Sequence, residues 1–239
     1  ITCRDWSSDV CSSDLFQVEV EEVKLLRDKI AGKIRDAIVE GKIKPGERLM
    51  EPEVAKLLGV SRTPLREAFL QLESEGFMVV TPRKGAVVSE LSVRDAEDTY
   101  IIKSQLEALA AKLSVENADK HLIVELEHLN KKMEAVTESS KKDYKLFLTL
   151  NAEFHRLLTE TCGNEKLIKY INLLRKQTLR YNFIYLSILS HFNQSVSEHK
   201  EIIDAIKKRD VVAVETLVKN HGNAAKIAIC DFMKQKMSN

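Results

Sequence analysis

Residues 59–76 read GVSRTPLREAFLQLESEG, and this stretch decides the fold of the first third of the chain. Ser61 is a good N-cap residue, and Pro64 fits the first turn of a helix because amides there have no intrahelical partner. Apolar residues then recur at helical spacing until Gly76 ends the pattern. The stripe consists of Leu65, Phe69 and Leu72. An amphipathic helix is therefore predicted over residues 61–75.

Two further helices are predicted before this one. Apolar residues recur at helical spacing from Val23 to Ile38, and the pattern stops at Gly41, ahead of a Lys-Pro-Gly turn. A short helix fits residues 51–58, with Gly59 as its C-terminal stop. Its expected apolar face consists of Val54, Leu57 and Leu58.

A hairpin is predicted directly after the third helix. Residues 77–80 and 86–88 are apolar and β-prone, and the segment between them carries Arg83, Lys84 and Gly85 at a basic tip. Three helices followed by a hairpin are typical of a winged helix-turn-helix, so we expect residues 16–91 to form that domain.

The chain beyond Ser92 shows only long helical periodicities, without another proline. Helices are predicted over residues 92–113, 122–136, 145–162, 164–188, 194–208 and 211–233, with Ser92 and Asn164 as caps. Helices of this length suit an antiparallel bundle. The expected fold class is therefore mainly α, with an N-terminal winged helix-turn-helix followed by an all-α bundle over residues 92–239.

Residues 1–15 differ from the rest of the chain. They hold the only Trp, two of the four Cys and a Ser/Asp repeat, and they resemble translated sequencing-adapter contamination more than a natural leader. We expect this segment to be non-native or disordered and to contribute nothing to the fold.

Composition limits the classes of partner. The 239 residues include 37 Lys and Arg against 36 Asp and Glu, so any DNA-binding surface must be local. No run approaches the roughly 18 to 20 apolar residues that cross a bilayer. Four cysteines without paired spacing indicate a reducing compartment. A cytoplasmic protein without a membrane segment is expected.

The start of the helix over residues 61–75 has the chemistry of a DNA-reading element. In a helix-turn-helix, the N-terminal residues of the second helix of the motif meet base edges and phosphates. Arg62 and Arg66 share one face, opposite the apolar stripe, and lie beside the hydroxyls of Ser61 and Thr63. Such a pair can also be ordinary solvated charge, but the order of elements around it favours DNA recognition.

Four residues of the second domain suggest a metal site. Asn151 and His155 lie one helical turn apart, and His199 and His221 fall on the last two predicted helices. A single helical histidine is usually a core or surface residue. Three imidazoles and a side-chain carbonyl brought together would suit a divalent ion, with zinc or nickel favoured.

The stretch IxxGxxxPGERLxExxxAxxLGVSRTPxREAFxxLExEG closely resembles the DNA-binding domain of GntR-family bacterial regulators, across nearly all of residues 25–90. The resemblance implies a homodimer that binds a two-fold symmetric operator. It also implies DNA contacts from Ser61, Arg62, Thr63, Arg66 and the wing residues Arg83, Lys84 and Gly85. Pro52 departs from some relatives, which place a DNA-contacting Arg there.

Residues 95–235 are similar to the FCD type of ligand domain found in the FadR-like subfamily. The resemblance implies a divalent metal on Asn151, His155, His199 and His221, and a small organic acid as effector. Lys103 stands where relatives commonly carry an Arg that faces the pocket, and Arg180 is a second candidate cation for the acid. Many relatives have Asp in place of Asn151, which leaves metal affinity and identity open.

The favoured hypothesis is a repressor whose operator affinity responds to a carboxylate effector. One alternative keeps DNA binding but makes the metal purely structural. Another is a metal-dependent enzyme built on the histidines. Against the enzyme, the sequence has no HExxH or nucleophile motif, and its general-base candidates, Glu153 and Glu198, are turned by helical geometry away from the neighbouring histidine.

Overall fold

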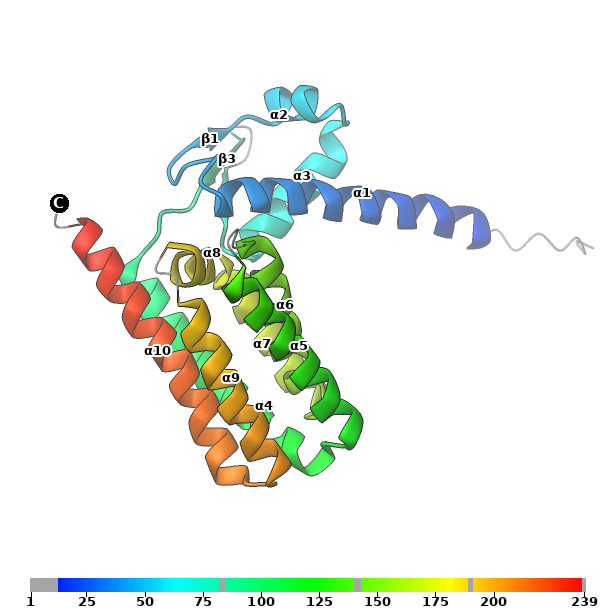
Figure 1. Cartoon of the computed structure of the whole chain (residues 1–239). Helices are drawn as coiled ribbons and strands as arrows, with labels where there is room; N and C mark the ends of the chain where they lie inside the picture. The colour runs from blue at the N-terminus through cyan, green and yellow to red at the C-terminus, as the bar shows by residue number, and fades with distance from the viewer. Residues whose placement is uncertain (1–12, 82–84, 140–142, 189–190, 238–239) are drawn as a thin grey trace, which may run out of the picture. The chain divides into compact units, whose positions relative to one another are not determined.

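The computed structural model describes residues 13–81, 85–139, 143–188 and 191–237 (Figure 1). Contacts divide the chain into two compact units, residues 1–89 and 90–239. The first unit combines helices with a small sheet, and the described residues of the second form helices and their connections, with no strand. The expected fold class is confirmed.

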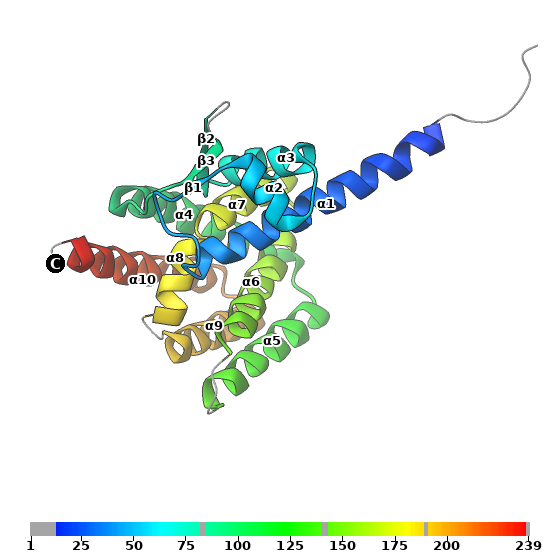
Figure 2. The ribbon, with the colours of Figure 1, turned by 90° about the horizontal axis from the view of Figure 1, so that it is seen from above.

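Across its described residues, the first unit contains three helices and a three-stranded antiparallel sheet (Figure 2). Its elements are α1 (Ser13–Val39), β1 (Arg48–Leu49), α2 (Glu51–Leu58), α3 (Arg62–Ser74), β2 (Met78–Thr81) and β3 (Gly85–Val88). β3 lies between the other strands, and its pairing with β2 is the predicted hairpin. The sequence did not predict β1, because two residues are too few to show an alternating pattern.

The predicted apolar stripe of α3 forms the core of this unit. Leu65, Phe69 and Leu72 are fully buried, and α3 packs against α1. The Arg35 guanidinium in α1 donates to the buried Glu75 carboxylate through Nε at 2.9 Å and Nη2 at 2.5 Å. This ion pair holds α1 against the C-terminal end of α3.

Two details differ from the sequence prediction. α1 begins at Ser13, so residues 13–15, which were assigned to the leader, form the first turn of a helix. Leu57 in α2 is 84% exposed, whereas Ala55 is buried. Successive residues of a helix are rotated by about 100°, so Leu57 points away from the face formed by Val54, Ala55 and Leu58. The prediction that Leu57 belongs to the core face was therefore wrong.

The second unit contains the predicted long helices, one of them broken. They are α4 (Val93–Asn117), α5 (Lys120–Glu138), α6 (Tyr144–Glu160), α7 (Glu165–Gln177), α8 (Leu179–Phe183), α9 (Phe192–Lys207) and α10 (Val211–Met237). The predicted caps are confirmed, because the side chain of Ser92 accepts from the amide of Asp95 and that of Asn164 from the amide of Leu167. Gly163, with a φ of 68°, lies two residues beyond the C-cap of α6.

Five of these helices enclose one core. α4 packs on α10, α10 on α9, α9 on α5, α5 on α6, and α6 back on α4, while α7 packs on α4 (Figures 1 and 2). The largest fully buried side chains of this unit are Tyr100, Leu126, Met133, Phe147, Phe154, Ile171 and Tyr181. Residues far apart in the sequence therefore face a common interior.

The single helix predicted over residues 164–188 is interrupted at Thr178. This buried residue ends α7 and precedes α8, and its hydroxyl donates to the carbonyl of Arg175 at 3.1 Å. Bonding of a Thr hydroxyl back to its own helix often bends the helix. A π-helical segment, η1 (Ile184–Ile188), then follows α8.

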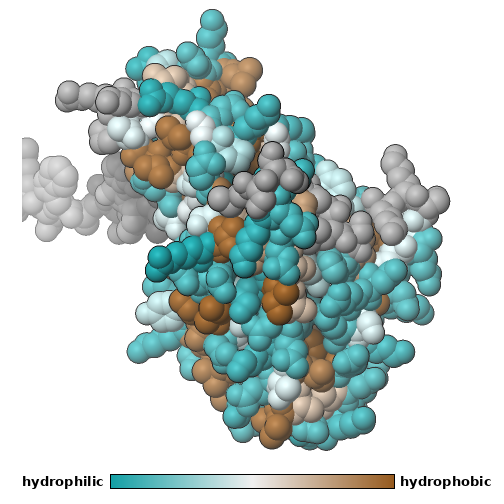
Figure 3. Space-filling model, turned by 90° about the vertical axis from the view of Figure 1, so that its left-hand side faces the viewer, coloured by the Kyte–Doolittle hydropathy of each residue, from teal (hydrophilic) through white to brown (hydrophobic). Residues whose placement is uncertain are grey.

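None of the helices in the described ranges is long and apolar enough to cross a membrane. Hydrophilic residues dominate the face drawn in Figure 3, and hydrophobic residues there form small separate groups. Single exposed apolar residues are normal for a folded domain and need no lipid partner.

Candidate functional site

The N-terminal end of α3 presents polar groups outward. Ser61, Arg62 and Thr63 are exposed. Ser61 occupies the N-cap position, but its hydroxyl makes no capping hydrogen bond. The first turn of a helix also offers unpaired amides and the positive end of the helix dipole, both of which favour phosphate. This surface therefore has the donors that contact with a DNA backbone requires.

Arg66 extends this surface but has a competing partner. Its guanidinium is 62% exposed and donates through two nitrogens to the Glu51 carboxylate of α2, at 3.1 and 2.7 Å. That hydrogen bond is the main reason that the pKa of Glu51 is lowered. An exposed pair of this kind is weakly held, so a phosphate or guanine can replace Glu51.

Gly85 has a structural role at the loop end of the hairpin, where it pairs with Thr81. Its φ is 81°, and a Cβ added there would lie 2.3 Å from the carbonyl oxygen of Leu49 in β1. Both the backbone conformation and the close approach of β1 therefore demand glycine. The neighbouring candidates, Arg83 and Lys84, lie outside the described residues.

The structure brings the three predicted histidines together. His155 lies on α6, His199 on α9 and His221 on α10, and their ligand atoms all lie within 4.8 Å of one another. The ring centroids of each pair are 4.9 to 5.1 Å apart. In the described part of the chain, no other His, Cys or carboxylate group satisfies this criterion.

The cluster is buried, and burial favours the neutral form of His155 and His199. His199 is fully buried and stacks on Phe154 with centroids 4.1 Å apart, yet neither of its ring nitrogens has a hydrogen-bond partner among the described residues. Burial, and then the neighbouring His221, lowers the pKa of both His155 and His199 well below the ordinary value. Neutral imidazoles with free lone pairs are the form that metals bind.

Asn151 and Glu198 complete the immediate surroundings. The Oδ1 atom of Asn151, one turn before His155 on α6, is buried and has no hydrogen-bond partner within the described ranges. The Nδ1–H of His221 donates to the Glu198 carboxylate at 2.5 Å. A carboxylate on one ring nitrogen fixes the tautomer and leaves Nε2 free, as is usual for metal-binding histidines.

A buried ion-pair network adjoins the cluster. The Glu107 carboxylate accepts from Lys103 Nζ at 2.7 Å and from Arg175 Nε at 3.0 Å. Arg175 also donates to the backbone carbonyl of His155 at 2.7 Å, and both cations contribute to the low pKa of His155. Burial alone would raise the pKa of Glu107, but Lys103 and then Arg175 lower it to about 2.

Arg180 occupies a different place from Lys103. The Arg180 guanidinium donates to the carbonyl of Glu90 at 3.4 Å, close to the start of the second unit. Arg175, five residues earlier in the chain, contacts the cluster residue His155. Lys103 is thus linked to His155 through Glu107 and Arg175. Arg180 instead donates to the backbone of Glu90.

The sequence matches two family models. Residues 26–88 match the model described as bacterial regulatory proteins of the gntR family, and residues 98–224 match the FCD domain, which spans more than half of the chain. The chain belongs to the GntR family.

Relatives along most of its length are regulators too. The HTH-type transcriptional regulator YdhC of Bacillus subtilis is 30% identical, over 80% of this chain and 84% of YdhC. A probable repressor of a D-xylose utilization operon in Paenarthrobacter nicotinovorans is 28% identical, over 83% of this chain and 88% of the relative. The solved structure of Escherichia coli McbR/YncC has the same fold, with a TM-score of 0.73 at 24% identity over 87% of this chain and 98% of that chain.

These matches make this GntR protein a DNA-binding transcriptional regulator and exclude the enzyme alternative. They also agree with the surfaces described above. An exposed basic helix terminus stands in the unit that matches the gntR model, and the histidine cluster stands in the unit that matches the FCD domain.

Sequence reasoning missed three groups beside the cluster of this regulator: Glu107, Arg175 and, as the partner of His221, Glu198. It also missed the buried Tyr185. Arg175 carried a usable signal, because it is a cation within the mostly apolar stretch from Ile171 to Leu189. Glu107 carried another, four residues after Lys103 on the same helix. Tyr185 carried none, because a tyrosine in an apolar stretch is usually core.

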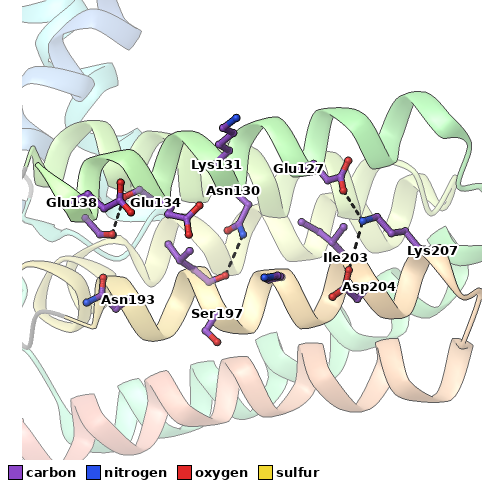
Figure 4. A pocket seen from close by; sticks show the side chains of 13 residues that line it. Glu127, Asn130, Lys131, Glu134, Glu138, Asn193, Ser197, Ile203, Asp204 and Lys207 are labelled. Atoms are coloured by element: carbon purple, nitrogen blue, oxygen red, sulfur yellow. Dashed lines mark hydrogen bonds and ion pairs between the residues drawn. The ribbon is translucent and has the colours of Figure 1, made fainter.

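A groove of about 600 Å³ lies between α5 and α9, away from the histidines (Figure 4). α9 presents Ser197 and Lys200 to this groove, whereas His199 lies in the interior. At one end, Lys207 pairs with Glu127 at 2.5 Å and with Asp204 at 3.6 Å. The charged side chains of the groove are solvated or already paired, so the interior histidine cluster is the better candidate for a binding site.

Proposed function

We propose that this GntR regulator is a dimeric repressor whose operator affinity is controlled by a small carboxylic acid bound beside a metal ion in the second unit. The observation that carries the proposal is the cluster of His155, His199 and His221, whose ligand atoms all lie within 4.8 Å of one another. Beside it, both ring nitrogens of His199 and the Oδ1 atom of Asn151 are buried without a hydrogen-bond partner among the described residues. Burying such atoms without partners is costly unless a ligand satisfies them.

The donor set fits a divalent ion. Three imidazoles with one amide oxygen are typical of zinc or nickel rather than of calcium or magnesium, which prefer all-oxygen sites. When bound, such an ion would supply open coordination positions that a carboxylate can occupy. Glu198 holds the ring of His221 in the binding tautomer, and Phe154 fixes the ring of His199 by stacking.

The charge around the cluster favours an anionic effector. Lys103 and Arg175 are two cations against the single carboxylate of Glu107, which leaves one net positive charge in this network. All three side chains are mostly shielded from water, so the surplus charge acts at low dielectric. A small acid would therefore be attracted to this end of the cluster.

DNA contacts are proposed for Ser61, Arg62, Thr63 and Arg66 on α3. The exposed hydroxyls and guanidiniums at the start of that helix support this assignment. Arg83, Lys84 and Gly85 are proposed as wing contacts, on the strength of the family match over residues 26–88. Repression is favoured because the regulator of D-xylose utilization that resembles this chain is named a repressor.

Dimerisation is proposed through the second unit. α4 and α7 pack against each other, and both expose large apolar side chains. Ile102 is 52% exposed and Tyr170 is 61% exposed, and Leu109 and Leu173 are exposed as well. A second copy of the chain would bury these groups and present two recognition helices to a two-fold symmetric operator. An effector that binds one arrangement of the dimer more tightly then shifts operator affinity.

The test combines thermal stability with operator binding. The purified protein is stripped with a chelator and then melted alone, with Zn²⁺ or Ni²⁺, and with each metal plus a panel of short carboxylic acids. We expect the metal to raise the melting temperature by several degrees, and one class of acid to raise it further. The same acid should change affinity for a DNA site selected from a random pool.

Matched variants identify the site. His199→Ala should abolish the metal-dependent rise, whereas His128→Ala, at an exposed histidine on α5, should leave it unchanged. A metal-dependent rise with no effect of any acid on DNA affinity would support a purely structural metal and contradict effector control. No rise with either metal would remove the metal site.

A further inference from the structure

Tyr185 is a buried polar group that the proposed metal site does not use. The residue is 4% exposed, and its hydroxyl has no hydrogen-bond partner in the part of the chain that the structure describes. Its ring stacks on His191 with centroids 4.6 Å apart and planes 5° from parallel. Since buried polar groups are normally hydrogen-bonded, this hydroxyl is free to hydrogen-bond to a bound ligand.

The segment that carries Tyr185 packs against two of the helices that carry the histidine cluster. Tyr185 belongs to η1, which packs against α6 and α10, the helices that carry His155 and His221. Burial, and then the nearby charge of Glu198, raises the pKa of Tyr185. A chain of contacts leads from Tyr185 to the same carboxylate, because its ring partner His191 hydrogen-bonds to Gln194 at 2.8 Å and Gln194 donates to Glu198 at 2.9 Å. Glu198 in turn accepts the hydrogen bond from His221, a proposed metal ligand.

The local backbone at Tyr185 is unusual. π-helical turns are rare and occur frequently at functional sites. In this chain the π-helical segment directly follows α8, which is only five residues long. Tyr185 therefore lies only two residues beyond the end of α8, so its movement would act directly on that short helix.

Three consecutive residues of α8 hold the beginning of the second unit. Arg180 donates to the carbonyl of Glu90 at 3.4 Å, and Tyr181 donates to the carbonyl of Ser92 at 3.3 Å and to the Asp95 carboxylate at 2.8 Å. Asn182 accepts a hydrogen bond from Tyr100 of α4. Residues 90–95 are the segment through which the chain enters this unit from the first unit.

We propose that Tyr185 determines effector specificity by hydrogen bonding to a second oxygen of the bound acid, and that α8 passes the resulting shift to residues 90–95. This inference rests on the proposed function. The second oxygen is assigned to a hydroxyl, because a hydroxyl can accept from Tyr185 and donate to Glu198, whereas a second carboxylate would be repelled by Glu198. The preferred effector class is therefore a short 2-hydroxy acid.

The experiment compares wild type, Tyr185→Phe and Tyr181→Phe. Each protein is loaded with Zn²⁺ and titrated with propanoate, 2-hydroxypropanoate, butanoate and 2-hydroxybutanoate, with binding followed by thermal shift and operator affinity by fluorescence anisotropy. Wild type should prefer each 2-hydroxy acid over its plain partner by about tenfold, the effect of roughly one hydrogen bond. Tyr185→Phe should lose this preference and keep the stabilisation by Zn²⁺ alone.

Tyr181→Phe tests the transmission step separately. This variant should bind 2-hydroxy acids as wild type does, but its operator affinity should respond to them several-fold less. An unchanged preference in Tyr185→Phe would overturn the specificity role, and an undiminished operator response in Tyr181→Phe would overturn the role of α8. If wild type responds to no acid of either kind, both the proposed function and this inference fail. If wild type responds and Tyr185→Phe keeps the full preference for 2-hydroxy acids, only this inference fails.

Discussion

The two candidate surfaces use charge in opposite ways. On α3, Arg66 is mostly exposed, and its ion pair with Glu51 is open to solvent. Inside the second unit, Lys103, Glu107 and Arg175 form a network that is largely removed from water. Solvent screens the first arrangement and hardly screens the second, so changes inside the bundle should alter folding, while changes on α3 should alter DNA binding alone.

Glu107→Gln should have the largest effect. It leaves two buried cations without their carboxylate, and breaking a buried pair in this way costs roughly 3 to 5 kcal/mol. The free energy of unfolding of the second unit, measured by urea denaturation at pH 7, should fall accordingly. Glu153→Gln is the matched control, because Glu153 pairs with Arg156 on the exposed surface and should cost less than about 1 kcal/mol.

The effect of Glu107→Gln should depend on pH. The pKa of Glu107 is lowered from 4.5 to about 2, because Lys103 and Arg175 together outweigh the effect of burial, which alone would raise it. A carboxyl with a depressed folded-state pKa adds stability above about pH 4.5, and that stability is lost as the pH falls toward 2. The difference in the free energy of unfolding between wild type and Glu107→Gln should therefore decrease below pH 4.5. A gap that stays constant down to pH 3 would contradict this role for Glu107.

Gly85→Ala should have the next largest effect, on the first unit. Alanine is strained at a φ of 81°, and its Cβ would collide with the Leu49 carbonyl, so β1 or the hairpin must shift. A loss of about 2 kcal/mol or more in the unfolding free energy is expected. Gly32→Ala is the control, since Gly32 lies within α1 with open space around it and should gain about 0.5 to 1 kcal/mol. Equal stability of both variants would show that the hairpin tolerates a Cβ at Gly85.

The sequence could predict features that depend on local periodicity. The stripe of Leu65, Phe69 and Leu72 identified the core face of α3. Ser92 and Asn164 identified helix starts through their caps. The resemblance to FCD domains singled out His155, His199 and His221, which the bundle does bring together. These features depend on a few neighbouring residues or on a motif of fixed spacing.

The features that the sequence could not predict depend on packing between distant segments. Arg175 reaches Glu107 across 68 positions, and Glu198 reaches His221 across 23. The break at Thr178 could not be predicted either, because the apolar pattern continues through it. Since a periodic pattern reports which face is buried and not what lies opposite, the partners of buried charges became visible only in the folded bundle.

Arg66→Ala tests the exposed surface. Loss of a guanidinium that contacts a base or phosphate should lower affinity for a selected DNA site by about tenfold to a hundredfold, with the melting temperature unchanged because Arg66 is exposed. Arg94→Ala removes an exposed arginine from the second unit and should leave DNA affinity close to wild type. Normal DNA binding by Arg66→Ala would contradict the assignment of α3 as the reading helix.

Glu51→Gln should give the smallest change and in the opposite direction. It removes the carboxylate that competes with DNA for Arg66, so affinity should rise by about two- to fivefold at low salt, and the gain should shrink as salt screens the pair. Glu53→Gln makes the same change of charge on the same helix, at an exposed residue. The effect of releasing Arg66 is therefore the gain in DNA affinity of Glu51→Gln minus that of Glu53→Gln. Equal gains in DNA affinity for the two variants would mean that DNA responds to the total charge of α2. The ion pair with Glu51 would then not limit the binding of Arg66 to DNA.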